Sequence, residues 1–397
     1  MLYRCGVTAL FGAVALVRSA VAQSDPPLHY YDTAIGKTGT MLKSALQSII
    51  RNHTVLPYTG GTDTWTALKV LDQDPVNSNN VLLIYSGFTV PKSEQFNGST
   101  GTWDREHLWP QSFGIIALNS NSRAKSDLFN IRPINVSVNS SRGNKYYDIS
   151  TPPFSTRADA PGSSYDNDSW EPRDDEKGTI SRSMFYMAVR YDGSDADVPD
   201  LELSDTPNAN LYRFGKLTSL LAWNREFFPT ASERDRNQHI YSDYQHNRNP
   251  FVDHPDYAEM VFNGVSPGLA WQHTQFTDAE LANPLIGGDS GDPDRDDLKN
   301  LIEYTINGDP WKPDNDSIVT ATVTSVGSTN NLYITYPHNR NATDLTLSYE
   351  VSSNLVTWTA AAATLISATV ITSETEEVTV RISSTVSVLF ARLRANR

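Results

Sequence analysis

One short segment, residues 104–114, concentrates groups that can do chemistry. It reads D-R-E-H-L-W-P-Q-S-F-G, with two carboxylates, a guanidinium and an imidazole at its first four positions. His107 can hold or release a proton near neutral pH, and Glu106 can bind a hard cation. The alternative without catalysis is a polar surface strand on which Glu106 forms an ion pair with Arg105. The segment is therefore a candidate reaction centre that needs partners elsewhere in the chain.

A second polar segment, residues 126–145, can supply those partners. It reads S-D-L-F-N-I-R-P-I-N-V-S-V-N-S-S-R-G-N-K. If the chain is helical through Asn139, then Asn139 and Arg142 lie three residues apart and share a face. The amide oxygen could join a carboxylate on a metal while an arginine meets a phosphate. Asn139 could instead cap a helix.

Charge is distributed unevenly along the chain. The formal net charge is -14, which alone does not indicate a nucleic-acid-binding protein. Residues 101–145, however, contain six basic residues against three acidic ones, a local charge of +3. A basic stripe on an acidic protein can still attract a polyanion.

The N-terminus is typical of a cleaved signal peptide over residues 1–22. Arg4 precedes an apolar run, and A-V-A at residues 20–22 is a small-residue cleavage site. A short membrane anchor is the alternative, but the run is too short to span a bilayer comfortably. The only cysteine, Cys5, lies in this segment, so the mature protein would contain no disulfide. We expect a secreted or periplasmic monomer without stable membrane association.

The remaining pattern predicts an α+β protein with an all-β C-terminal part. Apolar spacing predicts helices at residues 39–50, 181–191 and 211–224, and a buried strand at residues 81–87. Residues 148–178 are rich in Pro, Ser and Asp and are predicted to form a surface excursion. We expect a mixed domain at residues 23–283, a linker at 284–315 and a β-sandwich-like module at 316–397. The module contains no cluster of titratable residues that indicates a site.

The linker contains a candidate calcium loop, D-P-D-R-D-D-L-K-N-L-I-E, at residues 292–303. Oxygen-bearing groups occupy the EF-hand ligand positions 1, 3, 5, 7, 9 and 12. They belong to Asp292, Asp294, Asp296, Leu298, Asn300 and Glu303. Asp297 stands at position 6, where glycine is expected for the turn. We expect structural Ca²⁺ here, with an acidic linker as the alternative.

The chain resembles the secreted and periplasmic endonuclease I family of non-specific nucleases. The resemblance rests on the two polar segments together with S-R-S-M-F-Y-M-A-V-R-Y at residues 181–191, Q-H-N-R-N-P-F-V-D-H-P at residues 245–255 and an N-terminal Y-Y-D-T-A-I-G-K-T-G-T-M-L-K-S-A-L. These motifs occur in order over roughly residues 28–262, which makes them far more specific than one short pattern. The resemblance implies a ββα-metal (His-Me finger) core inside the mixed domain.

The family pattern also implies roles for individual residues. His107 would be the general base that activates water, and Glu106 and Asn139 would hold Mg²⁺, with Mn²⁺ or Ca²⁺ as substitutes. Short relatives hold the phosphate with an arginine between the base and the helix of the ββα core; Arg123 lies in that interval at a different spacing, and Arg142, from its place beside Asn139, is the other candidate. The substrate would be DNA, and RNA as a second substrate, cut to 5′-phosphorylated fragments. Phe129 replaces a histidine of many relatives that is not the base.

Two questions stay open from the sequence. Adjacent residues of a regular strand point to opposite faces, so Glu106 and His107 need either an irregular strand or a phosphate approached from two sides. The rival function is a non-catalytic extracellular protein, which binds nucleic acid on a nuclease-like scaffold or a glycan on the β module. A metalloprotease or glycosidase is disfavoured, because the chain contains no H-E-x-x-H motif and no evident carboxylate pair.

Overall fold

A computed structural model describes residues 25–98, 101–313, 318–385 and 390–397, which form two compact units. The first unit spans Gly39–Gly264, and the second combines Val265–Arg397 with Pro27–Thr38. The predicted signal peptide lies outside the described residues. Within them, no helix is both long and apolar enough to cross a bilayer.

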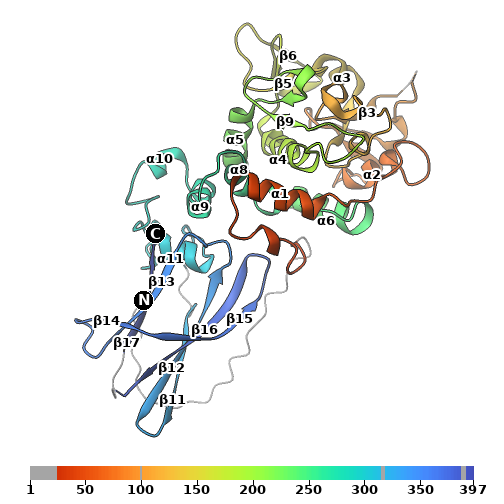
Figure 1. Ribbon diagram of the computed structural model, residues 1–397. Coiled ribbons are helices and arrows are strands. Elements are labelled where there is room, and N and C mark those ends of the chain that lie inside the picture. Colours follow the sequence, from red (N-terminus) through yellow and green to blue (C-terminus); the bar gives the residue numbers. More distant parts are fainter. Residues whose placement is uncertain (1–24, 99–100, 314–317, 386–389) are drawn as a thin grey trace. The chain divides into compact units, whose positions relative to one another are not determined.

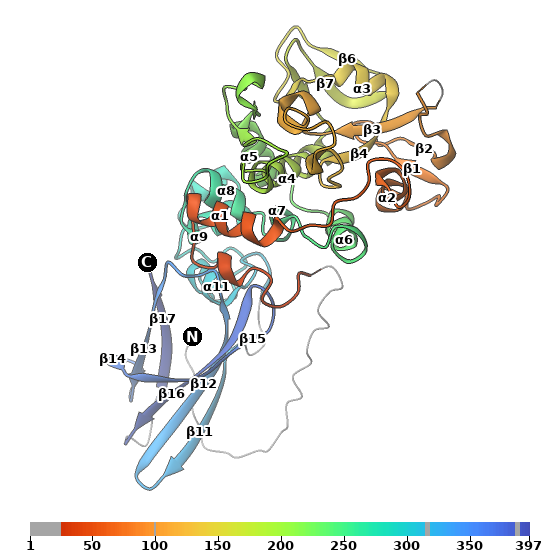
Figure 2. The same cartoon turned by 45° about the vertical axis from the view of Figure 1, so that its right-hand side comes forward.

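The centre of the first unit is two strands followed directly by a helix. Strand β3 (Trp103–His107) pairs antiparallel with β4 (Ile131–Asn135), and α3 (Val136–Arg142) begins at the next residue (Figure 2). The Asn135 side chain caps α3 by accepting hydrogen bonds from the backbone N–H groups of Ser137 and Val138. Helix α3 packs against both strands. This is the ββα arrangement that the resemblance implied.

Helices and short strands surround this core (Figure 1). The other helices are α1 (Gly39–Ile50), α2 (Thr64–Leu71), α4 (Asp174–Arg190), α5 (Leu217–Glu226), α6 (Ala231–His239), α7 (Pro250–Asp253) and α8 (Tyr257–Phe262). The other strands are β1 (Asn80–Leu82), β2 (Thr89–Pro91), β5 (Tyr146–Tyr147), β6 (Ser155–Arg157), β7 (Ala160–Tyr165), β8 (Ser169–Glu171), β9 (Glu202–Leu203) and β10 (Arg213–Phe214). Helix α4 is buried along most of its length, which explains its weak amphipathic pattern.

The sequence predicted several of these elements with shifted bounds. The helix at residues 39–50 is confirmed as α1. The predicted strand at residues 81–87 is shorter, because the chain turns at Tyr85, whose φ is +71°. The predicted surface excursion contains β6, β7 and β8, which complete with the preceding β5 a four-stranded sheet in the order β5-β8-β7-β6. The helix predicted from residue 211 begins at Leu217, because residues 213–214 pair as a strand with β9.

The second unit carries two antiparallel sheets that share one apolar core. The first is β11-β12-β16-β15 and the second β14-β13-β17. Their bounds are β11 (Thr320–Val326), β12 (Thr329–Asn339), β13 (Thr346–Ser352), β14 (Thr359–Ala361), β15 (Ala363–Val370), β16 (Thr375–Ser384) and β17 (Phe390–Asn396). Alternate residues of β12 and β16, such as Ile334 and Val380, meet Ala391 of β17 in this core. The predicted α+β class with an all-β C-terminal part is confirmed.

Three helices precede or join these sheets: α9 (Pro267–Gln275), α10 (Asp278–Leu281) and α11 (Asn300–Ile306). Trp271 and Phe276, at α9 and its C-terminal end, pack with Tyr304 of α11. Residues 265–283 therefore belong structurally with the second unit, whereas composition placed the boundary near residue 283.

Candidate active site

His107, the last residue of β3, is a buried and neutral imidazole, with 6% of the residue exposed. Its Nε2 lies 2.9 Å from the carbonyl oxygen of Lys125. A carbonyl can only accept, so Nε2 carries the proton and Nδ1 carries the lone pair. Burial is the main cause that lowers the His107 pKa to about 4; the hydrogen bond to the Lys125 carbonyl opposes this shift, and the nearby cations Arg105, Lys125 and Arg142 add to it. At neutral pH, Nδ1 can therefore accept a proton, and the Gln111 amide donates to it at 3.2 Å.

Glu106 is held through one of its two oxygens. The Tyr85 hydroxyl donates to Glu106 Oε1 at 2.9 Å, and Arg142 Nε lies 3.3 Å from the same oxygen. Burial raises the Glu106 pKa, while Arg142 and the Tyr85 hydroxyl oppose the shift. Oε2 accepts no hydrogen bond from any described residue.

Tyr85 is itself fixed by three partners. The Tyr147 hydroxyl lies 2.6 Å from the Tyr85 hydroxyl and donates to it, because the Tyr85 proton is used on Glu106. The Tyr85 backbone N–H donates to the Glu176 carboxylate at 2.6 Å, and the Tyr85 carbonyl accepts from the Ser163 hydroxyl at 3.1 Å. These bonds stabilise the left-handed backbone at Tyr85, which a tyrosine rarely adopts. The carboxylate orientation is therefore set by a rigid support.

Glu106 and His107 contact different sets of residues. The ladder of β3 and β4 is regular through the pairs Glu106↔Arg132 and His107↔Ile131. Glu106 meets Tyr85 and Arg142, whereas the His107 ring lies 5.8 Å from the Tyr58 ring. The strand is thus regular, so the irregular strand, one of the two options left open by the sequence, is not what the structure shows.

Asn139 lies on the face of α3 that approaches Glu106. Arg142, three residues further along the helix, contacts Glu106 directly, and residues three apart share a helix face. The Asn139 side chain is partly exposed and forms no hydrogen bond with the described residues. It does not cap α3, since Asn135 does. An unengaged Glu106 oxygen and a free amide suit Mg²⁺, which binds few protein oxygens and retains water.

The two arginines predicted to hold phosphate are engaged elsewhere. Arg142 is 1% exposed, and its guanidinium donates to the carbonyls of Leu108 (2.5 Å) and Gly143 (3.0 Å). Arg123 forks between Asp197, 2.9 Å from its Nε, and Asp195, 3.1 Å from its Nη1. The short helix Arg123–Lys125 that these bonds anchor carries the carbonyl that fixes His107. Both guanidinium groups therefore already hold protein partners, and their contact with a phosphate stays a prediction.

Several residues of this site were missed by the sequence prediction. Tyr85 and Tyr147 approach Glu106 from distant segments, and no spacing signal could have found them. Gln111 could have been predicted, because it lies only four residues after His107 in the segment 104–114. Tyr58 and the Lys125 carbonyl depend on the folded loops around β3.

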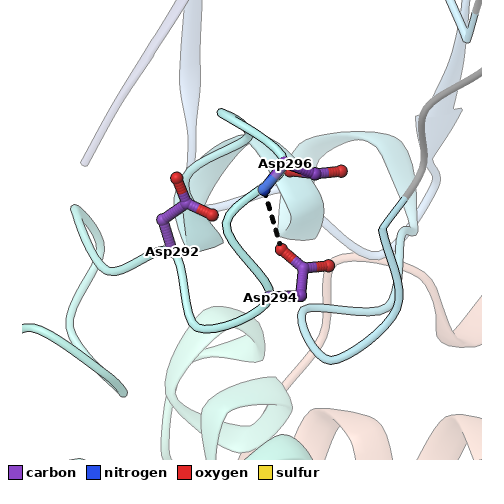
Figure 3. Close-up of side chains that lie close together, drawn as sticks. All are labelled: Asp292, Asp294 and Asp296. Atoms are coloured by element: carbon purple, nitrogen blue, oxygen red, sulfur yellow. Dashed lines mark hydrogen bonds between the residues drawn. The ribbon is translucent and has the colours of Figure 1, made fainter.

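Three of the six predicted calcium residues come together, in the second unit. Carboxylate oxygens of Asp292, Asp294 and Asp296 lie within 4.8 Å of one another (Figure 3). Asp297 has φ +73°, so the loop makes the turn for which glycine was expected. Asn300 and Glu303 are buried at the start of α11. Oδ1 of Asp292 and of Asn300 is buried without a hydrogen-bond partner.

Comparison with known proteins identifies the family of this chain. The model of the family described as Endonuclease I matches residues 38–256. An extracellular ribonuclease of Bacillus amyloliquefaciens is 47% identical over 234 residues, covering 59% of this chain and 78% of that protein. An extracellular ribonuclease of Bacillus subtilis (strain 168) is 47% identical over 235 residues, with the same coverage of 59% and 78%. The match to the family spans both polar segments and more than half of the chain, and the chain belongs to the endonuclease I family.

Proposed function

We propose that this protein is an exported, metal-dependent nuclease that hydrolyses phosphodiester bonds in DNA and RNA with little sequence preference. The observation that carries the proposal is a neutral His107 with an accepting Nδ1, next in the chain to a Glu106 with one free oxygen. The nuclease class follows from family membership. RNA is included because the Bacillus relatives are named ribonucleases, and export because they are named extracellular.

In the proposed reaction, His107 Nδ1 takes a proton from a water molecule. The water oxygen attacks phosphorus, and the bond from phosphorus to the 3′ oxygen breaks, leaving a 5′-phosphate. Mg²⁺ held by Glu106 and Asn139 would neutralise charge on the phosphate and the leaving oxygen. The Lys125 carbonyl keeps His107 in the correct tautomer, and Tyr85 and Arg142 orient Glu106.

The first test is cleavage of plasmid DNA and ribosomal RNA by the chain freed of residues 1–22. We expect both substrates to be degraded in Mg²⁺, and excess EDTA to stop the reaction because Glu106 and Asn139 then have no cation. Gel mobility over time measures the effect. Binding of DNA that EDTA does not alter, without cleavage in any divalent ion, would favour the binding-protein alternative.

We further propose that residues 292–303 bind a structural Ca²⁺. Saturating Ca²⁺ should raise the melting temperature of the second unit by several degrees, since a ligand at about 100 times its Kd stabilises by about 2.7 kcal/mol. Calorimetry of the full chain with Ca²⁺ and with EDTA measures the shift. The variant Asp294→Asn/Asp296→Asn should lose it.

Asp297→Asn is the matched control for this loop. It removes the same kind of charge, but asparagine tolerates the left-handed backbone at this position and Asp297 lies outside the three-carboxylate cluster. It should keep the Ca²⁺ response. An equal response in the wild type and the double variant would show that the loop is an acidic linker.

A further inference from the structure

The six basic residues of the segment 101–145 divide into two groups in the structure. Three form ion pairs: Arg123 with Asp195 and Asp197, Arg132 with Asp72, and Arg142 with Glu106. The other three, Arg105, Lys125 and Lys145, form no ion pair with a described residue. These three residues are therefore the basic side chains of the segment that have no carboxylate partner at ion-pair distance among the described residues.

Two of the three cations meet at one tyrosine beside His107. The Arg105 guanidinium lies 3.4 Å and the Lys125 ammonium 4.6 Å from the centre of the Tyr58 ring. The Tyr58 ring in turn lies 5.8 Å from the His107 ring. We call Tyr58, Arg105 and Lys125 the Tyr58 cluster. It places positive charge on the His107 side of β3, opposite the Glu106 contacts.

The two cations of the Tyr58 cluster differ in how many hydrogen bonds they donate to the protein. Arg105 is tied down, because its Nη1 donates to the Tyr58 carbonyl (2.5 Å) and to the Thr64 hydroxyl (2.8 Å). The Lys125 ammonium donates to a single acceptor, the Ser120 carbonyl, at 3.1 Å. An ammonium has three donors, so two remain for a ligand. Lys125 is also fixed at its backbone, where its carbonyl accepts from His107.

We propose that Lys125 is the catalytic residue that holds the scissile phosphodiester, by donating from its ammonium to a non-bridging phosphate oxygen. This inference rests on the nuclease function proposed above. We assign Lys125 this role in place of Arg123 and Arg142, because both guanidinium groups form ion pairs with carboxylates, whereas the Lys125 ammonium does not. Tyr58 and Arg105 are positioning residues that keep the ammonium beside His107. The ligand class is the phosphodiester backbone common to RNA and DNA, which an unpaired lysine recognises as a point charge.

The test compares Lys125→Gln with Lys145→Gln. Both remove one unpaired cation from the same segment, but the Lys145 ammonium lies over the Tyr165 ring, 5.4 Å from its centre, and not over Tyr58. We expect Lys125→Gln to lower kcat/KM at least tenfold and to reduce the slope of log kcat/KM against log salt concentration by about one. Lys145→Gln should stay within about twofold of the wild type. Lys125→Arg should recover most of the loss, which a purely structural defect would not.

Equal kcat/KM and salt slopes for Lys125→Gln and the wild type would overturn the inference, as would an equal loss in Lys145→Gln. Binding of a short fluorescent oligonucleotide in EDTA separates this result from a failure of the nuclease proposal. If the wild type binds but never cleaves, the nuclease proposal fails. A loss of binding in Lys125→Gln alone would then still support a phosphate subsite, and equal binding by both variants would exclude it.

Discussion

The His107→Ala variant should lose nearly all cleavage, with kcat lowered roughly 10²- to 10⁴-fold, the contribution typical of a general base. The reason is that Nδ1 is the only accepting nitrogen of this imidazole, since Nε2 donates to the Lys125 carbonyl. Initial rates on plasmid DNA and on RNA in Mg²⁺ measure the effect. Oligonucleotide binding in EDTA should remain, because the substitution leaves the three side chains of the Tyr58 cluster in place and removes only the hydrogen bond from His107 to the Lys125 carbonyl.

His53→Gln is the matched control for His107→Ala. His53 is also buried, and burial likewise lowers its pKa to about 4, with an opposing effect from Asp127. Its Nδ1 accepts from Arg190 at 3.0 Å, and a glutamine oxygen can replace that acceptor. This variant should keep its cleavage rate once its stability has been checked by thermal unfolding. If His107→Ala cuts as fast as the wild type, the assignment of the base is wrong.

The candidate ligands and base could be proposed from the sequence, whereas the residues that contact them could not. His107, Glu106 and Asn139 stand in short local patterns, and they lie on one strand and on the helix that follows its partner strand. Tyr85 could not be predicted, because its hydroxyl contacts a residue 21 positions away through an unusual turn. Long-range contacts of this kind depend on the tertiary fold, which a single sequence does not specify residue by residue.

The partners of Arg123 and Arg142 could not be predicted from the sequence either. Residue type and spacing made Arg123 and Arg142 reasonable phosphate ligands, because both are basic and lie near the motifs. Their carboxylate and carbonyl partners come from other segments: Asp195 and Asp197 lie more than 70 positions from Arg123. Once those partners are known, Lys125 stands out as an unpaired cation beside Tyr58 whose ammonium has two donors left for a ligand. Asp297 is a smaller example, since the loop adopts a left-handed turn without glycine.

Arg142→Met should destabilise the protein by about 3–5 kcal/mol, the usual cost of breaking a buried ion pair. Arg142 is fully buried, contacts Glu106 at 3.3 Å, and satisfies the carbonyls of Leu108 and Gly143. Methionine fills similar volume, but it leaves these oxygens without a donor and Glu106 without its counter-charge. Urea unfolding measures the free energy. Arg213→Met is the control, since its pair with Glu202 is about 40% exposed on each side and should contribute less than about 1 kcal/mol.

A second substitution separates lost charge pairing from lost packing. If the uncompensated Glu106 carboxylate causes most of the loss, Glu106→Gln/Arg142→Met should be more stable than Arg142→Met, because the buried charge is removed with its partner. If lost packing causes the loss of stability, Glu106→Gln/Arg142→Met should be no more stable than Arg142→Met. A loss as small as that of Arg213→Met would contradict the role given to Arg142. It would also mean that Tyr85 alone suffices to hold the carboxylate on which the proposed metal site depends.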